Sequence, residues 1–350
     1  MSIDFGLDTF GDVTRGADDE LLAPAQVLRH VVDEGALADR VGVDAFSVGE
    51  HHRADFAISA PEVMLAAIAT RTSRIRLGSA VTVLSTDDPV RVFERFSTLD
   101  AVSGGRAEVT LGRGSFTESY PLFGFDLQQY EQLFEERLDL FVRLLAQTPV
   151  TWMGETRAAL SNVLVHPRVE HGRLQTWVGV GGSPQSVVRA ARHGLPLMLA
   201  IIGGDPARFV PYVDLFQKSL ADAGRPTLPV GAHSPGHIAP TDDQARNELW
   251  PHYRDMINRI GRERGWSPIG RAQFDHDVEH GSLYVGSPDT VAAKIARTIQ
   301  TLGLARFDLK YSHGGLPHDL LMRSIELYGT QVVPKVRSLI SGTTGTTGER

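Results

Sequence analysis

The stretch that decides the fold lies between residues 44 and 53 and runs Asp44-Ala45-Phe46-Ser47-Val48-Gly49-Glu50-His51-His52-Arg53. Its first six residues are mostly apolar and bounded by turn residues, a pattern that predicts a buried strand. Where this strand should end, the chain places a carboxylate, two imidazoles and a guanidinium side by side. Because α/β proteins place their chemistry at the ends of buried strands, this strand end is the first candidate site.

Strand-like and helix-like segments alternate on both sides of this stretch. The apolar runs predict strands at residues 3–7, 44–49, 75–83, 106–112, 176–180, 195–202, 229–233 and 306–311. Strands separated by helices must run parallel, because a parallel pair needs a crossover connection. About eight such units favour a TIM (β/α)8 barrel over an open doubly wound sheet. The first strand also lacks the Gly-x-Gly-x-x-Gly turn of the doubly wound alternative.

The pattern predicts one domain over residues 1–340, since no composition break marks a second one. Residues 148–175 have no clear period and are expected to form an insertion outside the repeating units. Residues 341–350 are rich in Gly and Thr without apolar side chains, which predicts a disordered tail.

Composition and charge exclude several classes of function. A net charge of -7 without a long basic run argues against nucleic acid as a partner. The absence of cysteine removes disulfides, thiolate nucleophiles and iron–sulfur clusters. No apolar run approaches the roughly 20 residues that span a bilayer, and the first residues do not resemble a signal peptide. We therefore expect a soluble, cytoplasmic protein.

In a TIM barrel, the active site lies where the strands end. The cluster at Glu50, His51 and His52 allows three interpretations there: a metal site, polar packing at the rim, or a neutral imidazole that acts on a bound ligand. Adjacent side chains of an extended segment point opposite ways, so His51 and His52 are poorly placed to bind one ion. We favour the imidazole interpretation and expect no metal.

A Gly-rich turn runs straight into a helix at Gly179-Val180-Gly181-Gly182-Ser183-Pro184-Gln185-Ser186. Backbone N–H groups at a helix N-terminus bind anions, and glycines let a phosphate approach the backbone. Ser183 and Ser186 add hydroxyl donors. The alternative is an ordinary capped helix start, but capping needs only Ser183 and Pro184. The extra glycines favour phosphate binding.

Arg113 sits between two glycines just after the fourth expected strand. Arg113 is expected to contact an anionic or electron-rich ligand or, alternatively, to form a salt bridge with Glu50 or Glu118. The aromatic residues of the next loop belong either to the core or to the wall of an apolar pocket; they are Phe116, Tyr120, Phe123 and Phe125. Together these features suit a phosphorylated planar cofactor without identifying it.

Several motifs occur in the order and at the spacing found in the bacterial luciferase-like flavin monooxygenases. They are Glu50-His51-His52, residues 78–84 (GSAVTVL), residues 89–91 (PVR), residues 99–106 (LDAVSGGR), Gly112-Arg113-Gly114, residues 123–126 (FGFD) and residues 191–197 (ARHGLPL). The resemblance covers residues 3 to about 335. Each piece alone is weak, but the ordered set is specific for this family.

The resemblance implies a TIM barrel that binds reduced FMN, usually supplied by a separate flavin reductase, and uses O2 to oxygenate a small organic substrate. On this basis His51 matches the family's active-site histidine, and Ala80-Val81 matches a cis peptide under the flavin ring. Phosphate-binding positions match Arg113, Gly182, Ser183 and Ser186, with Gly181 in the same turn. Glu50 and Val180 fall near the ring.

Departures from luciferase itself are also visible. Gly112 stands where the luciferase α subunit has a reactive cysteine, Gly182 stands where it has a Glu, and residues 240–285 offer no counterpart of its long lid. We therefore do not expect light emission from a fatty aldehyde. The alternatives to an FMN-dependent monooxygenase are a deazaflavin-dependent dehydrogenase and a non-catalytic flavin-binding barrel. The resemblance also implies a homodimer, for which residues 59–71 and 88–103 are the candidate interface helices.

Overall fold

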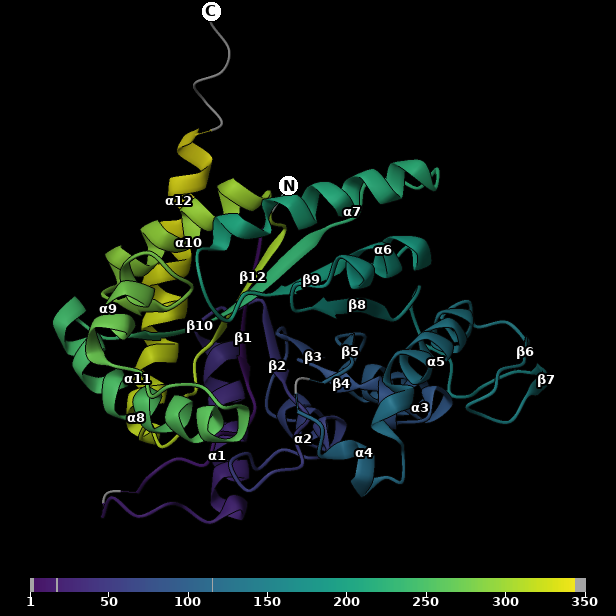
Figure 1. Ribbon diagram of the computed structural model, residues 1–350, viewed down its shortest axis with the longest axis horizontal. Helices are drawn as coiled ribbons and strands as arrows, with labels where there is room; N and C mark the ends of the chain where they lie inside the picture. The colour runs from purple at the N-terminus through teal and green to yellow at the C-terminus, as the bar shows by residue number, and fades with distance from the viewer. Residues whose placement is uncertain (1–2, 17, 115, 344–350) are drawn as a thin grey trace, which may run out of the picture.

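Parallel strands close into a barrel with helices around it (Figure 1). The computed structural model describes residues 3–16, 18–114 and 116–343. Neighbours in the sheet follow the order β3-β2-β1-β12-β10-β9-β8-β5-β4. Since β3 and β4 are successive pieces of one strand and the N–H of Leu77 in β3 donates to the carbonyl of Arg106 before β5 (2.8 Å), the ring closes. The expected TIM barrel is confirmed.

The barrel strands lie where the apolar runs predict them, with small shifts at their ends. They are β1 (Asp4–Thr9), β2 (Ala45–Val48), β3 (Arg76–Ser79), β4 (Thr82–Val83), β5 (Glu108–Gly112), β8 (Gln175–Val180), β9 (Leu197–Ala200), β10 (Val230–Ile238) and β12 (Arg306–Lys310). The third expected strand is interrupted between β3 and β4, where the peptide bond Ala80–Val81 is cis, as the resemblance implies.

Helices surround the barrel, and most of them begin at a side chain that accepts hydrogen bonds from the first N–H groups or at a proline, as in α3, where Asp88 accepts from Val90 and Arg91. They are α1 (Pro24–Arg40), α2 (Pro61–Ala69), α3 (Pro89–Ser103), α4 (Ser119–Leu122), α5 (Tyr130–Leu144), α6 (Pro184–His193), α7 (Val210–Asp222), α8 (Asp242–Arg264), α9 (Arg271–Glu279), α10 (Pro288–Leu302), α11 (His318–Leu327) and α12 (Val333–Thr343). None of those within the described ranges is long and apolar enough to cross a membrane.

Three regions differ from the prediction in detail. The insertion at residues 148–175 contains an antiparallel hairpin of β6 (Val150–Trp152) and β7 (Leu160–Val163). Between α8 and α10 the sequence pattern missed α9 and the three-residue strand β11 (Tyr284–Gly286), which pairs with the end of β10. Residues 341–343, expected in the tail, belong to α12, and residues 344–350 lie outside the described part of the chain.

The barrel interior is closed at its N-terminal end by buried ion pairs. Arg306 of β12 donates to Asp308 (2.7 Å) and to Glu108 of β5, and all three side chains are almost fully buried. A buried charge requires such partners, because the free energy lost when the charge leaves water would otherwise not be recovered. The open end of the barrel, where the C-terminal strand ends meet, is therefore the place for a ligand.

Candidate functional site

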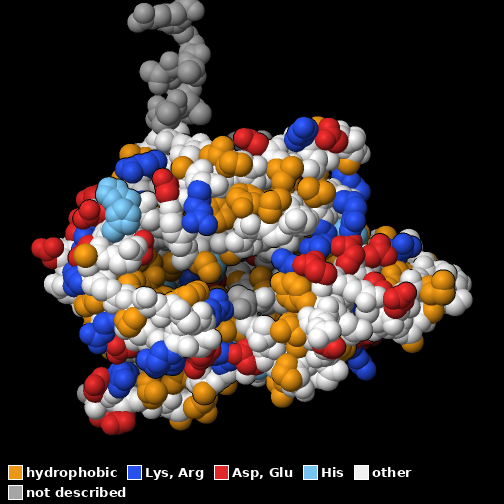
Figure 2. Space-filling view, viewed as in Figure 1, with side chains coloured by type: hydrophobic (Ala, Val, Ile, Leu, Met, Phe, Trp, Pro, Cys, Tyr) orange, Lys and Arg blue, Asp and Glu red, His pale blue; other side chains and the backbone are white. Residues whose placement is uncertain are grey.

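A cavity of about 460 Å³ occupies the C-terminal end of the barrel. Figure 2 shows the molecule hollowed near the middle of one face, with hydrophobic side chains gathered there. The cavity wall includes every residue predicted for the site, namely Glu50, His51, Ala80, Val81, Arg113, Val180, Gly181, Gly182, Ser183 and Ser186. These residues come from the ends of four strands (β2, β3, β5 and β8) that are far apart in the chain, so the fold brings the predicted set together.

The strand order divides the cavity into two sides. The Gly-rich turn follows β8 and Arg113 follows β5, and these neighbouring strands lie across the barrel from β1 and β12. On the opposite side, His51 follows β2 and Phe10 follows β1, while His233 lies within β10. We call the first side the cradle and the second the histidine side.

The cradle is built from backbone at the start of α6. Ser183 is the N-cap, and its hydroxyl accepts from the N–H of Ser186 (3.4 Å). The N–H groups of Gly181, Gly182 and Ser183 make no hydrogen bond to any described residue. Gly182 has φ of +116°, a conformation that L side chains rarely adopt, and a Cβ at Gly181 would point into open space. Free N–H groups at a helix N-terminus fit a phosphate.

Two guanidinium groups complete the cradle. Arg113 and Arg189 both donate to the buried hydroxyl of Ser186, at 3.2 Å and 3.4 Å. Arg113 also stacks on Tyr130, with 4.6 Å from guanidinium to ring centre. Both arginines pair with the exposed carboxylate of Glu131, at 2.7 Å from Arg189. The alternative prediction of a salt bridge from Arg113 to Glu50 or Glu118 is wrong. Arg113 pairs with Glu131, and Glu118 pairs with Arg53 instead.

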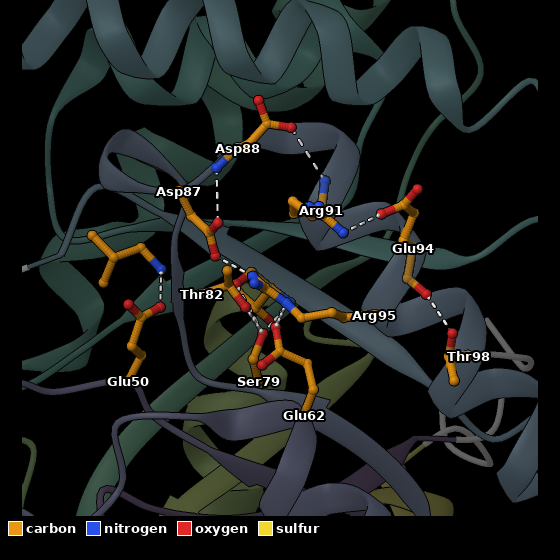
Figure 3. Close-up of polar contacts among 12 residues, drawn as sticks. Glu50, Glu62, Ser79, Thr82, Asp87, Asp88, Arg91, Glu94, Arg95 and Thr98 are labelled. Atoms are coloured by element: carbon orange, nitrogen blue, oxygen red, sulfur yellow. Dashed lines mark hydrogen bonds and ion pairs between the residues drawn. The ribbon is translucent and has the colours of Figure 1, made fainter. Parts of the chain in front are cut away.

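Glu50 fixes the cis segment that forms the floor of the cavity. Its N–H donates to the carbonyl of Val81 (3.3 Å), and its carboxylate accepts from the N–H of Val83 (2.9 Å). Figure 3 shows Glu50 and, on the other side of Thr82 and Ser79, Arg95 between Asp87 and Glu62. The second oxygen of Glu50 lies 2.9 Å from Nε2 of His52. Glu50 therefore positions the floor rather than offering a free carboxylate to the cavity.

Val81 explains why Gly112 is a glycine. A Cβ added at Gly112 would lie 2.5 Å from a methyl carbon of Val81, and one added at Gly179 would lie 3.0 Å from the other. Because real Cβ atoms essentially never approach closer than 3.0 Å, the side chain of Val81 needs the glycine at position 112. The space that a cysteine would fill at that position is taken by Val81.

His51 is surrounded by aromatic rings. Its ring centre lies 4.6 Å from Phe10, 4.5 Å from Phe56 and 5.3 Å from Phe116. Burial lowers the pKa of His51 to about 3, and Lys310, His52 and Arg53 act in the same direction against the opposing charge of Asp12. The imidazole is therefore neutral at ordinary pH, as the sequence interpretation requires.

Sequence reasoning missed several residues of the histidine side. Phe10 packs against His51, and the Nζ atom of Lys310 lies 4.7 Å from the ring centre of Phe10. His233 also lines the cavity, with Nδ1 at 2.9 Å from the carboxylate of Asp8. These side chains stand singly, after β1, within β10 and at the end of β12, so no local motif marks them. Only their position near the ends of the predicted strands could have indicated them.

A second, mostly apolar cavity of about 180 Å³ adjoins the first, since Phe10 and Ile202 line both. Its wall includes Phe116, from the loop where the sequence left core and pocket wall open. The other aromatics of that loop lie elsewhere: Tyr120 is buried, Phe123 packs on His52, and Phe125 lies under Arg137. Much of the remaining wall comes from α8 and its C-terminal loop, and the rest comes from other elements, namely Phe56, Pro235, Lys310 and His313. The α8 side contributes Tyr253, Met256, Ile257, Ile260, Arg264 and Trp266.

No cluster of three or more His, Asp or Glu side chains in the described ranges is arranged to hold a metal ion. The donor set of the large cavity instead suits an anionic phosphate at one end and a flat ring at the other. The cavity therefore fits a phosphorylated planar cofactor, on the free N–H groups of the cradle and the floor at Ala80–Val81.

Comparison with known proteins identifies the family. The profile described as luciferase-like monooxygenase matches residues 9–306, so the chain belongs to that family. The N-acetyl-S-alkylcysteine monooxygenase of Bacillus subtilis is 30% identical over 303 residues, 81% of this chain and 86% of that protein. The 4-hydroxyprotoasukamycin monooxygenase of Streptomyces nodosus is 28% identical over 334 residues, 89% of this chain and 87% of that protein.

Solved structures share the fold. Monooxygenase RslO1 from Streptomyces bottropensis has a TM-score of 0.81 at 24% identity, covering 95% of this chain and 99% of that one. The oxygenating constituent of 3,6-diketocamphane monooxygenase from Pseudomonas putida, in complex with FMN, has a TM-score of 0.76 at 19% identity (96% and 99% covered). The coenzyme F420 dependent tetrahydromethanopterin reductase from Methanopyrus kandleri has a TM-score of 0.70 at 19% identity (95% and 99% covered).

Proposed function

We propose that this protein is an FMN-dependent monooxygenase that oxygenates a small apolar organic molecule. The observation that carries the proposal is the single cavity that joins a phosphate cradle to a neutral histidine beside a cis-peptide floor. Family membership and the monooxygenase relatives support the reaction type. Reduced FMN would supply the electrons with which O2 is activated.

Each predicted residue then has a role, and that of Glu50 is to hold the floor segment in place. Gly181, Gly182, Ser183, Ser186 and Arg113 would bind the phosphate, with Arg189 behind Ser186. Glu131 now neutralises both arginines, so the phosphate would compete with this exposed carboxylate. The ring would lie against Ala80, Val81 and Val180.

His51 would hydrogen-bond to the reacting group and hold or move a proton there. Since its pKa is about 3, the imidazole accepts a proton only in passing and returns to the neutral form.

The apolar cavity beside Phe10 and Phe116 would bind the substrate. With about 180 Å³ and a wall that is mostly aromatic and aliphatic, it suits a small hydrocarbon-rich molecule. Closure by such side chains would keep water away from the reacting groups, which suppresses wasteful breakdown of activated oxygen.

We further propose a cytoplasmic homodimer that receives reduced FMN from a separate flavin reductase. Val63 of α2 and Val102 of α3 are exposed large hydrophobic residues in the two candidate interface helices, which supports an interface there. Sedimentation at micromolar concentration should give twice the monomer mass, and Val63→Asp with Val102→Asp should give the monomer.

The test is an anaerobic titration of the purified protein with reduced FMN, followed by admission of air while absorbance is recorded. We expect saturable binding, then consumption of O2 and slow return of oxidised flavin. Binding without O2 consumption favours a dehydrogenase or a non-catalytic flavin-binding barrel.

The second candidate is a deazaflavin-dependent dehydrogenase, because a barrel of this shape occurs in an F420-dependent reductase. The same cradle would take its phosphate, and hydride transfer would consume no O2. Parallel titration with coenzyme F420 separates the two, and we propose FMN because the Glu50-His51-His52 sequence is closer to the FMN branch of the family.

A further inference from the structure

His233 is a second histidine in the large cavity, and its surroundings are unlike those of His51. It lies in β10, two strands from β1, and its side chain is 13% exposed, toward the cavity that it lines. Its Nδ1 is held at 2.9 Å by the buried carboxylate of Asp8 from β1. Its Nε2 makes no hydrogen bond to any described residue. One ring nitrogen is thus fixed by a carboxylate while the other faces the space for a ligand.

Charged groups reach His233 from two elements besides its own strand. Asp8 comes from β1, and Asp308 and Lys310 come from β12. Burial by itself lowers the pKa of His233, but the two carboxylates outweigh burial and the repulsion of Lys310, so the pKa is raised. With Nδ1 donating to Asp8, a protonated ring also carries a hydrogen on Nε2 and becomes a donor toward the cavity.

The position of His233 determines which part of a bound cofactor its side chain would contact. The phosphate cradle lies at β5 and β8, whereas His233 lies on the histidine side with Phe10, at a tilted ring contact of 6.4 Å. His233 does not line the apolar cavity. Its neighbour in the cavity would therefore be the ring of the cofactor and not the phosphate or the apolar substrate.

We propose that the Asp8–His233 pair holds an imidazolium whose Nε2–H donates a hydrogen bond to the reduced flavin ring, so that the protein binds the reduced cofactor in preference to the oxidised one. This inference rests on the proposed use of FMN. No bond is made or broken in this step: reduced flavin carries negative charge in its ring, and a fixed cation stabilises that charge in a water-poor cavity. The same residue would let the protein retain cofactor that arrives already reduced.

The experiment compares dissociation constants for oxidised and reduced FMN at pH 7, the latter without oxygen. For His233→Asn we expect about tenfold weaker binding of reduced FMN and less than twofold change for oxidised FMN. A tenfold change in this ratio lowers the potential of the bound two-electron couple by about 30 mV, which is measured independently. Asp8→Asn leaves the ring in place and should shift the ratio in the same direction.

The matched control is His318→Asn. His318 also places Nδ1 at 2.9 Å from a carboxylate, that of Glu34, but it lines neither cavity. This variant should leave both dissociation constants unchanged.

Equal loss for both redox forms in His233→Asn, or no loss, overturns the inference while the proposed function stands. Wild-type protein that binds neither form overturns both. Should neither His233→Asn nor Asp8→Asn fold, nitrogen-15 NMR of the wild-type histidines decides: two protonated nitrogens on His233 at pH 7 support the inference, and a neutral ring overturns it.

Discussion

The two sides of the cavity are built by different means. The cradle consists of neighbouring residues at one helix start, with free backbone N–H groups. Its two arginines, Arg113 and Arg189, pair with the exposed Glu131. The histidine side consists of single residues from β1, β2, β10 and β12, packed among aromatic rings and buried carboxylates. Binding strength should therefore reside in the cradle, and control of protons and charge on the histidine side.

The largest expected effect concerns turnover and the histidine side. His51→Ala should leave FMN binding within about threefold and lower turnover by about 100-fold, because proton transfer by a positioned group contributes that much or more. The measurement is O2 consumption with reduced FMN and a substrate found by screening. His171→Ala, at an exposed histidine in the insertion, is the control. Unchanged turnover in His51→Ala would remove His51 from the chemistry.

The second-largest expected effect concerns phosphate binding by the cradle, and it distinguishes the cradle from the part of the cavity that would bind the ring. Arg113→Ala should weaken FMN binding by about 30-fold, because a hydrogen bond to a charged group contributes about 2 kcal/mol. Riboflavin, which has no phosphate, should bind the variant and the wild type equally. Titration with both ligands measures this difference, and Arg91→Ala, at an exposed position of α3, is the control. Equal losses for both ligands would place Arg113 at the ring and not at the phosphate.

A substitution between the two sides sharpens the comparison further. Gly112→Ala places a Cβ 2.5 Å from a Val81 methyl, so Val81 must move toward the ring position. Overpacking should lower the stability of the fold by about 1–3 kcal/mol. A displaced Val81 should also weaken ring binding by about tenfold, and here FMN and riboflavin should be affected alike. Gly270→Ala, where an added Cβ meets nothing within 4 Å, is the control. A loss confined to FMN would contradict the assignment of Val81 to the floor.

The smallest effect concerns the pH dependence of stability and involves His313, a buried histidine that lines the apolar cavity. Burial lowers the pKa of His313 to about 3, so the folded protein keeps this ring neutral while the unfolded chain protonates it below about 6.5. The unfolded state then binds more protons between pH 6.5 and 3, and stability falls as pH falls through that window.

Each such histidine contributes up to about 1.4 kcal/mol per pH unit. His313→Gln should flatten the fall in unfolding free energy between pH 7 and pH 5, measured by urea denaturation. His280→Gln, at an exposed position, should leave the slope unchanged. An unchanged slope in His313→Gln would mean that the ring is charged in the folded protein.

The alternation of apolar strands and amphipathic helices determined the barrel, because eight buried parallel strands with crossover helices have few other arrangements. The cradle was also predictable, since residues 179–186 contain the glycines, the cap and the helix start within one turn. The short elements β11 and α9 were missed because three residues of strand and a short polar helix carry too little pattern.

The tertiary structure alone decided the chemistry of the histidines. His51 and His233 have the same side chain, yet burial among Phe10, Phe56 and Phe116 lowers the pKa of one and Asp8 raises that of the other. Asp8 and His233 are 225 positions apart, and no local pattern shows that β1 and β10 face each other across β12. Electrostatics depend on distance and burial in space, and these are properties of the folded chain.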